Sequence, residues 1–302
     1  MNSITISVPA TTANLGVGFD CLGAALTMAN QFQFTAVDSE TKLKISVTGK
    51  EAEKVAQDAN NLIYQSFLQL YQAIGQTPPS VEIAIALGVP FSRGLGSSAT
   101  AIVGGLLGAN YLAGNPLSQT EIINLAIAIE GHPDNVVPAL LGNCQLSVWD
   151  GDRWQISSIP WHQEIIPVVA IPNFELSTAA ARSVLPDTYN RSDVIFNVSR
   201  MGLLLRALAV NNQDWLATAL EDQIHQPYRQ KLITGYQEVR QAALDAGAIG
   251  LVISGAGPTL LALTTPSQTE AVVSSMSLAW QQLNIEAAVH SLALDTKGAK
   301  II

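Results

Sequence analysis

An alternating apolar segment, a glycine-rich turn and a long apolar stretch follow one another in this sequence and constrain its fold more than any other feature. Val81, Ile83, Ile85 and Leu87 alternate with other residues, which predicts a strand. Residues 99–113 are apolar almost throughout, which predicts a buried helix. The turn between them reads Pro90-Phe91-Ser92-Arg93-Gly94-Leu95-Gly96-Ser97-Ser98-Ala99-Thr100. The chain must therefore pass from a strand through a tight turn directly into a buried helix.

This turn is suited to binding phosphate. The start of a helix carries unpaired backbone N–H groups and a partial positive charge. Gly94 and Gly96 permit positive φ and a close approach of backbone to ligand, while Ser97 and Ser98 add hydroxyls or cap the helix. The turn lacks the lysine of the Walker A pattern and does not match GxGxxG. A plain glycine-serine turn would also explain these residues, so both interpretations stay open at this point.

The longer string PxxxGLGSSA resembles the ATP-binding motif of the GHMP kinases, which include galacto-, homoserine, mevalonate and phosphomevalonate kinases. The resemblance implies that the turn binds ATP through Pro90, Arg93, Gly94, Leu95, Gly96, Ser97, Ser98, Ala99 and Thr100. Asn61, at the start of a helix predicted to run to about Ile74, resembles a family position near the adenine. An asparagine at a helix start is more often only a cap, so this implied contact is the weaker one.

Residues 9–26 match PxTxANLGxGFDxLGxAL and resemble the first motif of the homoserine kinases. Taken alone, Asn14 and Asp20 would indicate an Asx turn at each position, in a glycine-rich segment that folds closely over a ligand. The resemblance implies that both bind the acceptor amino acid, with Asp20 near its amino and hydroxyl groups. Asp20 is then either the base that accepts the hydroxyl proton or a group that only holds the ammonium. We favour the second role.

Glu130 lies at the C-terminal end of a predicted helix, where a carboxylate is unfavourable without a nearby cation. Either the side chain is solvated at a frayed end, or it binds a metal. Mg²⁺ usually takes one or two protein oxygens and completes its shell with phosphates and water, so Ser98 and Glu130 would suffice. The segment EGHPDNVxPALLG, residues 130–142, resembles the homoserine kinases. That resemblance implies that Asn135 approaches the acceptor hydroxyl and that His132 is not catalytic.

Two arginines in the second half of the chain are candidate ligands of a carboxylate. The STxxAR segment resembles the acceptor-binding segment of the homoserine kinases and implies that Thr178 and Arg182 bind the substrate. The DxxHxPYR run adds Arg229 as a second carboxylate partner, and guanidinium groups match carboxylates in geometry and charge. An exposed arginine is otherwise usually solvated. His225 is expected at the surface or in a helix cap.

A second glycine turn, with Gly255, Gly257 and Thr259, resembles the third GHMP motif, although a plain β-turn fits the string equally well. The resemblance implies that it packs beside the phosphate turn and steadies it. The overall implication is an α+β protein with the GHMP kinase fold. An ATP-binding domain of the ribosomal-protein-S5 type is expected over residues 1–163 and a ferredoxin-like domain over residues 164–302.

Net charge and cysteine content limit the partners and the compartment. The formal charge of −9 disfavours nucleic acid and anionic membranes as partners. The N-terminus shows no export signal, and Cys21 and Cys144 form neither a disulfide framework nor a metal set. We therefore expect a cytoplasmic protein with reduced thiols. The oligomeric state is left open, with a homodimer as one alternative.

The resemblance covers essentially the whole chain and implies phosphorylation of the L-homoserine hydroxyl by ATP with Mg²⁺. The product would be O-phospho-L-homoserine, on the route to threonine. Asp20 and Asn135 are the expected catalytic residues. One alternative is a GHMP kinase for another small alcohol, such as mevalonate or shikimate. The other is a non-catalytic protein of this fold that only binds a ligand or a partner.

Overall fold

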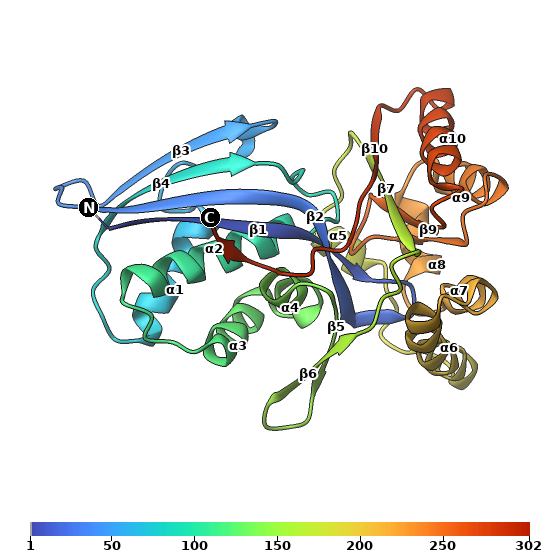
Figure 1. Cartoon of the computed structure of the whole chain (residues 1–302), viewed down its shortest axis with the longest axis horizontal. Coiled ribbons are helices and arrows are strands. Elements are labelled where there is room, and N and C mark those ends of the chain that lie inside the picture. Colours follow the sequence, from blue (N-terminus) through green and yellow to red (C-terminus); the bar gives the residue numbers. More distant parts are fainter. Residues whose placement is uncertain (1) are drawn as a thin grey trace.

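The computed structural model describes residues 2–302, which form two sheets covered by helices (Figure 1). The strand order of the first sheet is β11-β1-β2-β4-β3, and β5 and β6 form a hairpin that joins it through β2. Its strands are β1 Ser3–Asn14, β2 Gly18–Val37, β3 Leu43–Gly49, β4 Ser80–Leu87, β5 Cys144–Trp149, β6 Trp154–Ile159 and β11 Lys300–Ile301. The helices that follow these strands are η1 Ala52–Lys54, α1 Leu62–Ala73, α2 Ser97–Leu112, α3 Gln119–Glu130 and α4 Pro133–Leu141.

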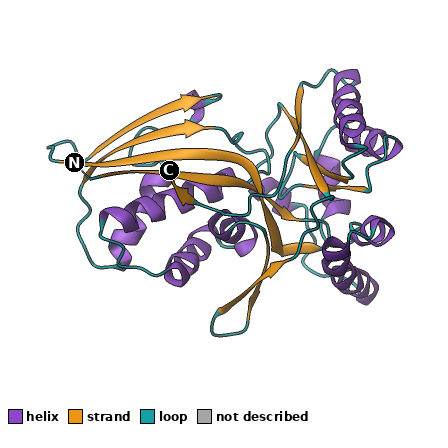
Figure 2. Ribbon diagram, viewed as in Figure 1, coloured by secondary structure: helices purple, strands orange, loops and turns teal. Residues whose placement is uncertain are grey.

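Helices α1 to α4 lie together on one face of the first sheet (Figure 2). Helix α2 packs tightly because it presents glycines to aromatic rings of β2. A Cβ atom on Gly104 would lie 2.4 Å from the Phe32 ring, and one on Gly108 would lie 2.5 Å from the Phe34 ring. This close packing fixes the axis of α2, and with it the direction in which the N-terminus of the helix points.

The long hairpin of β1 and β2 differs from the sequence prediction. The alternation of residues 4–9 indicates only a short strand, and residues 10–26 were expected as a glycine-rich segment over the ligand, but β1 and β2 take up most of this segment. Only residues 15–17 form the turn. β2 lies inside the sheet, between β1 and β4, while β3 is at its edge.

The second sheet is antiparallel and has the strand order β10-β7-β9-β8. Its strands are β7 Ile166–Pro172, β8 Gly250–Ile253, β9 Leu260–Thr264 and β10 Ala287–Ser291. In chain order this arrangement is 4-1-3-2, as in the ferredoxin-like domain that was predicted. The remaining helices are α5 Thr178–Ser183, α6 Arg191–Val210, α7 Gln213–Ala219, α8 Gln226–Arg229, η2 Gln230–Leu232, α9 Tyr236–Asp245 and α10 Thr269–Gln282.

The two sheets share part of their core. Helices α9 and α10 cover one face of the second sheet, and the other face packs in a cluster that contains Leu15 and Leu22 of the first hairpin, Val169 of β7 and Leu204 of α6. The division into residues 1–163 and 164–302 stays a prediction. It does not account for β11, which returns from the second half and pairs with β1.

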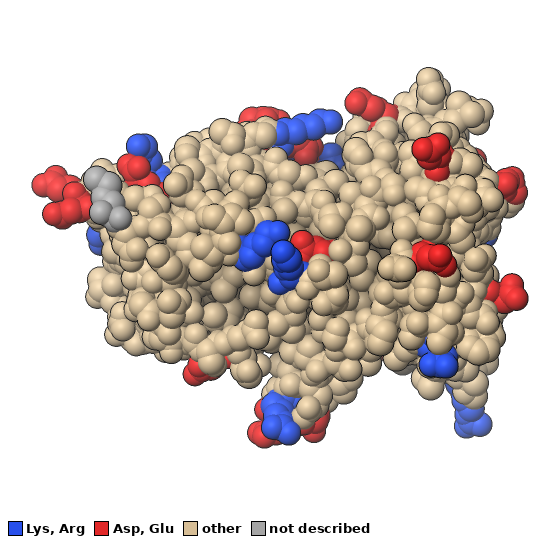
Figure 3. Space-filling view, viewed as in Figure 1, with Lys and Arg blue, Asp and Glu red and all other residues tan. Residues whose placement is uncertain are grey.

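Charged side chains on the visible face of the molecule are scattered singly or in small groups of mixed sign (Figure 3). Among residues 2–302, each helix is too short or too polar to cross a membrane. Cys144 is buried and Cys21 is partly buried, and both are free thiols. Burial raises the pKa of Cys144 to about 12, so its thiol stays protonated.

Candidate active site

A cavity of about 450 Å³ lies where the first hairpin, the start of α2, helix α5 and the second glycine turn meet. It brings together residues that are far apart in the sequence. The predicted site residues in its lining are Asn14, Asp20, Asn61, Arg93, Gly94, Gly96, Ser97, Ser98, Glu130, Asn135, Thr178, Arg182, Arg229, Gly255 and Gly257. The predicted residues that stand outside this lining are Pro90, Leu95, Ala99, Thr100 and Thr259.

The phosphate turn requires glycine at two positions. Gly94 and Gly96 have φ of 76° and 65°, in the left-handed region. A Cβ atom on Gly96 would lie 2.0 Å from Thr11 Oγ1, and one on Gly94 would lie 2.3 Å from the Ser254 carbonyl oxygen. Gly96 also precedes the first residue of α2, so the N–H groups of that helix open into the cavity. The backbone thus presents the donors that bind phosphate.

The second glycine turn contacts the phosphate turn directly. Ser254 Oγ donates to the Gly94 carbonyl at 2.6 Å, and the Thr259 N–H donates to the Arg93 carbonyl at 3.2 Å. Gly257 also lies against Gly94, since a Cβ on Gly94 would come within 3.0 Å of its nitrogen. The two turns therefore fix each other's backbone, although they are about 160 residues apart in the chain.

The Arg93 side chain donates to backbone carbonyls and to a carboxylate of the protein. Its Nε donates to the Pro172 carbonyl at 3.0 Å, Nη1 donates to the Phe91 carbonyl at 2.6 Å, and Nη2 donates to the Asn173 carbonyl at 3.1 Å. Nη2 also pairs with the Glu51 carboxylate at 3.1 Å. This guanidinium is 4% exposed and holds the phosphate turn against the end of β7.

Glu130 and Ser98 meet at one side of the cavity, as the metal prediction requires. Ser98 Oγ donates to Glu130 Oε2 at 2.8 Å. Burial raises the pKa of Glu130. The hydrogen bond from Ser98 acts in the opposite direction but has the smaller effect. Within the described part of the chain, no group of three or more His, Cys, Asp or Glu side chains could hold a metal ion. The protein offers one carboxylate and one hydroxyl oxygen here.

Asp20 and Arg182 form a bidentate ion pair across the cavity. Arg182 Nη1 donates to Asp20 Oδ2 and Nη2 donates to Oδ1, both at 2.9 Å. Asp20 has φ of 58°, and its backbone N–H donates to Asn14 Oδ1 at 3.0 Å. Asn14 Nδ2 donates to the Gly255 carbonyl at 2.8 Å. The amide of Asn14 thus holds the backbone that presents Asp20.

Arg229 lies close to Arg182, and the two guanidinium groups share one aromatic neighbour. Arg229 is 2% exposed, and its Nε and Nη1 donate to the carbonyls of Ala181 and Gly255 at 3.0 and 3.1 Å. The Phe19 ring centroid is 5.1 Å from Cζ of Arg229 and 5.9 Å from that of Arg182. Burial lowers the pKa of Arg229, and the charge of Arg182 adds to this effect.

Asn135 is held beside Gly96 by two hydrogen bonds. Its Oδ1 accepts from Thr11 Oγ1 at 2.8 Å, and its Nδ2 donates to Asp134 Oδ1 at 3.3 Å. Asp134 also bonds to His132 Nδ1 at 2.5 Å. Burial alone would lower the pKa of His132, but the hydrogen bond and charge of Asp134 raise it. Asp134 lines the cavity, and Thr11 supports Asn135 through its hydroxyl. Neither was predicted as a site residue, although both lie inside the motifs described above.

The remaining two predicted residues have different surroundings. Asn61 Oδ1 accepts from the backbone N–H of Ile63 at 2.9 Å, and its Nδ2 donates to the Ala56 carbonyl at 2.6 Å. Asn61 is thus the cap of α1, the alternative that the sequence left open. Thr178 is the first residue of α5 and is exposed at the rim of the cavity. One helical turn later, Arg182 lies on the same helix.

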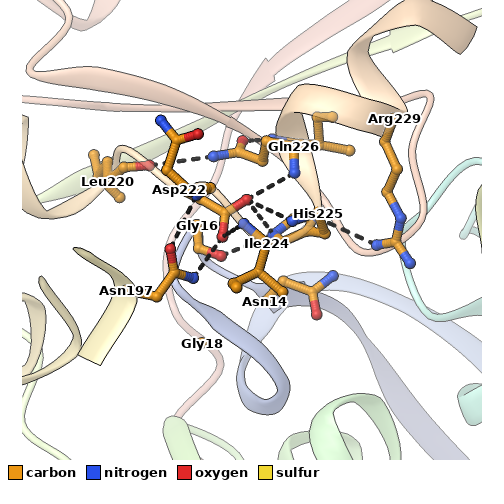
Figure 4. A network of polar contacts seen from close by, with 12 residues as sticks. Asn14, Gly16, Gly18, Asn197, Leu220, Asp222, Ile224, His225, Gln226 and Arg229 are labelled. Atoms are coloured by element: carbon orange, nitrogen blue, oxygen red, sulfur yellow. Dashed lines mark hydrogen bonds and ion pairs between the residues drawn. The ribbon is translucent and has the colours of Figure 1, made fainter. Parts of the chain in front are cut away.

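His225 departs most from its prediction. It was expected at the surface or in a cap. It does occupy the N-cap position of α8, but it is 0% exposed and its side chain makes no cap hydrogen bond. It lies in a network with Asn197, Asp222, Gly16 and Arg229 beneath the cavity (Figure 4). Its position in the sequence gives no signal of this burial, because the surrounding run is polar and short.

Comparisons with known proteins agree with this fold. Models of the GHMP kinases match twice, the N-terminal domain over residues 61–143 and the C-terminal domain over residues 204–282. A homoserine kinase of Crocosphaera subtropica is 62% identical over 302 residues, which are 100% of this chain and 98% of the relative. A homoserine kinase of Trichodesmium erythraeum is 60% identical over 299 residues, which are 99% and 98% of the two chains. The crystal structure of a homoserine kinase from Cytophaga hutchinsonii aligns with a TM-score of 0.90 at 30% identity, covering 100% of this chain and 98% of that one.

Proposed function

This chain belongs to the homoserine kinases of the GHMP kinase family, and on that premise we propose which residues carry out phosphoryl transfer from ATP to the hydroxyl of L-homoserine. The product is O-phospho-L-homoserine, an intermediate of threonine biosynthesis. One observation carries the assignment of residues. Opposite charges, from Asp20 on one hand and Arg182 and Arg229 on the other, meet in the cavity that the phosphate turn borders. A zwitterionic amino acid fits such a pair of charges.

The nucleotide is assigned to the backbone of residues 94–98. Phosphoryl transfer depends on positioning and on neutralisation of charge more than on covalent catalysis. The N–H groups at the start of α2 face the cavity, and a 16-residue helix behind them adds a favourable dipole for the γ-phosphate. Arg93 contributes by holding this turn in place, since its guanidinium has five partners in the protein.

Ser98 and Glu130 fit a Mg²⁺ ion by the chemistry of their donors. A hydroxyl and a carboxylate oxygen 2.8 Å apart are hard ligands, and a bound ion would obtain its remaining ligands from phosphates and water. The metal ion would offset charge on the transferred phosphoryl group. Glu130 must be ionised to bind a cation, and burial opposes this by raising its pKa. A cation beside it removes the cost of burying that charge.

The acceptor is assigned to the side chains across from the phosphate turn. Arg182 and Arg229 bind its carboxylate, Asp20 binds its ammonium group, and Asn135 directs its hydroxyl toward the phosphate turn. Thr178 borders the carboxylate site from the first turn of α5. The short distance between Asn135 Oδ1 and the position of a Cβ on Gly96, 3.2 Å, supports a hydroxyl held next to the bound phosphate. Holding both reactants in this way supplies several kcal/mol of the barrier reduction.

Asp20 is assigned to orientation and charge rather than to proton abstraction. Each of its carboxylate oxygens accepts one hydrogen bond from Arg182, which fixes the carboxylate in place and leaves a further lone pair on each oxygen for the ammonium group of the acceptor. The hydroxyl proton then passes to the phosphate. Replacing Asp20 by Asn and measuring single-turnover chemistry at saturating substrate tests this assignment. An undiminished rate supports orientation, whereas a loss of several orders of magnitude would assign the base role to Asp20.

The decisive assay measures ADP formation with Mg-ATP and each of three alcohols, L-homoserine, mevalonate and shikimate. Turnover with homoserine is expected to exceed turnover with the other two by at least about 100-fold, because only homoserine carries both charges that the site complements. Glu130→Gln is the matched variant, since it keeps the shape but removes the carboxylate, and it should lower kcat by about 100-fold or more. Preference for mevalonate or shikimate, or absence of ADP with every acceptor, would contradict the assignment.

A further inference from the structure

His225 is buried next to Arg229, which lines the cavity, and its backbone is held by the polar network drawn in Figure 4. The Asp222 carboxylate accepts from the backbone N–H groups of Ile224, His225 and Gln226 at 3.0, 2.8 and 2.7 Å. Asn197 Nδ2 in turn donates to Asp222 Oδ1 at 2.7 Å. The imidazole therefore projects from a fixed point, and the reaction steps described above make no use of it.

The contacts of the ring select one protonation state. His225 Nε2 lies 2.8 Å from the Gly16 carbonyl oxygen, which can only accept, so Nε2 carries a proton. Nδ1 lies 3.5 Å from Arg229 Nη1, which can only donate, so Nδ1 carries none. The neutral tautomer with its proton on Nε2 thus satisfies both neighbours. Burial lowers the pKa of His225, which keeps the ring neutral beside a guanidinium.

The same ring also supports the aromatic side chain between the two arginines. Phe19 stacks on His225 with centroids 5.2 Å apart and an angle of 23° between the planes. Phe19 directly precedes Asp20, and Gly16 lies in the turn that precedes both. His225 is therefore in contact with the segment that presents the negative charge of the site, and with Arg229, which supplies a positive one.

Arg229 needs such support because its guanidinium is buried and its direct contacts are with neutral groups. Its partners are the carbonyls of Ala181 and Gly255 and the ring of His225. Among residues 2–302 no carboxylate oxygen lies within 4.0 Å of its guanidinium nitrogens, whereas Arg182 is paired with Asp20. A desolvated cation of this kind binds an anion strongly if it is held in place.

We propose that His225 is a positioning residue that holds Arg229 and the Gly16–Asp20 segment at a fixed separation, and so sets the affinity of the site for the acceptor carboxylate. This inference rests on the proposed function, because it presumes that the acceptor is an amino acid. It assigns no contact between His225 and the substrate. The imidazole acts through its two neighbours.

The test compares His225→Ala with His225→Gln in the full-length protein. The alanine variant loses both contacts, whereas the glutamine amide can reach the Nε2 position and restore the donor to Gly16. KM is measured for L-homoserine, for ATP and for L-homoserine amide, which keeps the hydroxyl and the ammonium but lacks the carboxylate. His290→Ala is the control, because that histidine is exposed on β10.

For His225→Ala we expect KM for homoserine to rise about tenfold or more, with KM for ATP, KM for the amide and kcat within about twofold of the wild type. His225→Gln should recover most of the loss, and His290→Ala should match the wild type. Equal shifts for homoserine, the amide and ATP would overturn the inference, because they would indicate general loss of structure. If the alanine variant does not fold, the glutamine variant decides: wild-type KM for homoserine supports the Gly16 contact, and equal shifts for all three ligands overturn it. Absence of homoserine turnover by the wild type would instead overturn the proposed function itself.

Discussion

The two sides of the cavity are built from different parts of the polypeptide. The nucleotide side, as we propose it, is a single turn of main-chain donors and glycines, and the second glycine turn holds it in place. The acceptor side consists of charged side chains from three distant segments, namely Asp20, Arg182 and Arg229. A backbone site tolerates almost no change of shape. A side-chain site depends on charge and reach, and on what keeps those side chains apart.

The strongest test of this contrast is Gly96→Ala on the backbone side. The new Cβ would lie 2.0 Å from Thr11 Oγ1, and the alanine would have to adopt a left-handed backbone conformation. Displacement of the turn by about 1 Å should lower kcat/KM by about 100-fold or more. Gly114→Ala is the matched control, because Gly114 has φ of 87° and no atom within 4 Å of the added Cβ. That control should lose about 1 kcal/mol of stability and little activity. Similar kinetics for the two variants would remove the steric argument.

Arg182→Lys tests the acceptor side of the cavity. Lysine keeps the positive charge but cannot make the two parallel bonds to a carboxylate that a guanidinium makes. We expect KM for homoserine to increase about 10- to 50-fold and KM for ATP to change less than about twofold. Arg153→Lys is the control, since Arg153 forms an exposed ion pair with Asp150 far from the cavity. A rise in KM for both substrates would mean that the two sides are not independent.

The smallest expected effect concerns Glu130, which lies between the two sides. Burial raises the pKa of Glu130 in the folded state. Ionising this carboxyl at neutral pH therefore costs more free energy in the folded state than in the unfolded state. Without divalent cations, Glu130→Gln should therefore melt slightly above the wild type at pH 7. The difference should shrink as the pH falls through the raised pKa and the wild-type carboxyl is protonated. Thermal melts at pH 7 and pH 5 with a chelator measure this. A variant that melts below the wild type at pH 7 would contradict the direction.

The same contrast explains how much of the molecule the sequence could predict. The phosphate turn was predictable because strand, glycines, serines and helix are contiguous, and their chemistry is local. The ferredoxin-like order of the second half was also predictable from element order. The hairpin of β1 and β2 was predictable only at residues 4–9, because residues 10–14 are all buried. An alternating pattern, the usual signal of a strand, is therefore missing there.

The contacts of single side chains could not be predicted where the partners are backbone atoms of distant segments. Arg93 was expected at the nucleotide, but carbonyls of Pro172 and Asn173 at the end of β7 take up its donors. Asn14 was expected at the acceptor, but its amide is bound to Asp20 and Gly255. His225 showed no pattern at all, since only the fold places it under Phe19. A motif identifies which residues gather, and packing decides which of them remain free to bind.

The pairing of β11 with β1 has a consequence for biosynthesis. Lys300 and Ile301 supply the outer partner of β1, and Asp295 and Ala299 bond to the first half nearby. During translation, this part of the edge of β1 therefore stays open until residues 300 and 301 leave the ribosome. An unpaired edge is a template for intermolecular strand pairing. Deletion of Lys300 and Ile301 should accordingly reduce the yield of correctly folded protein, although neither residue lines the cavity.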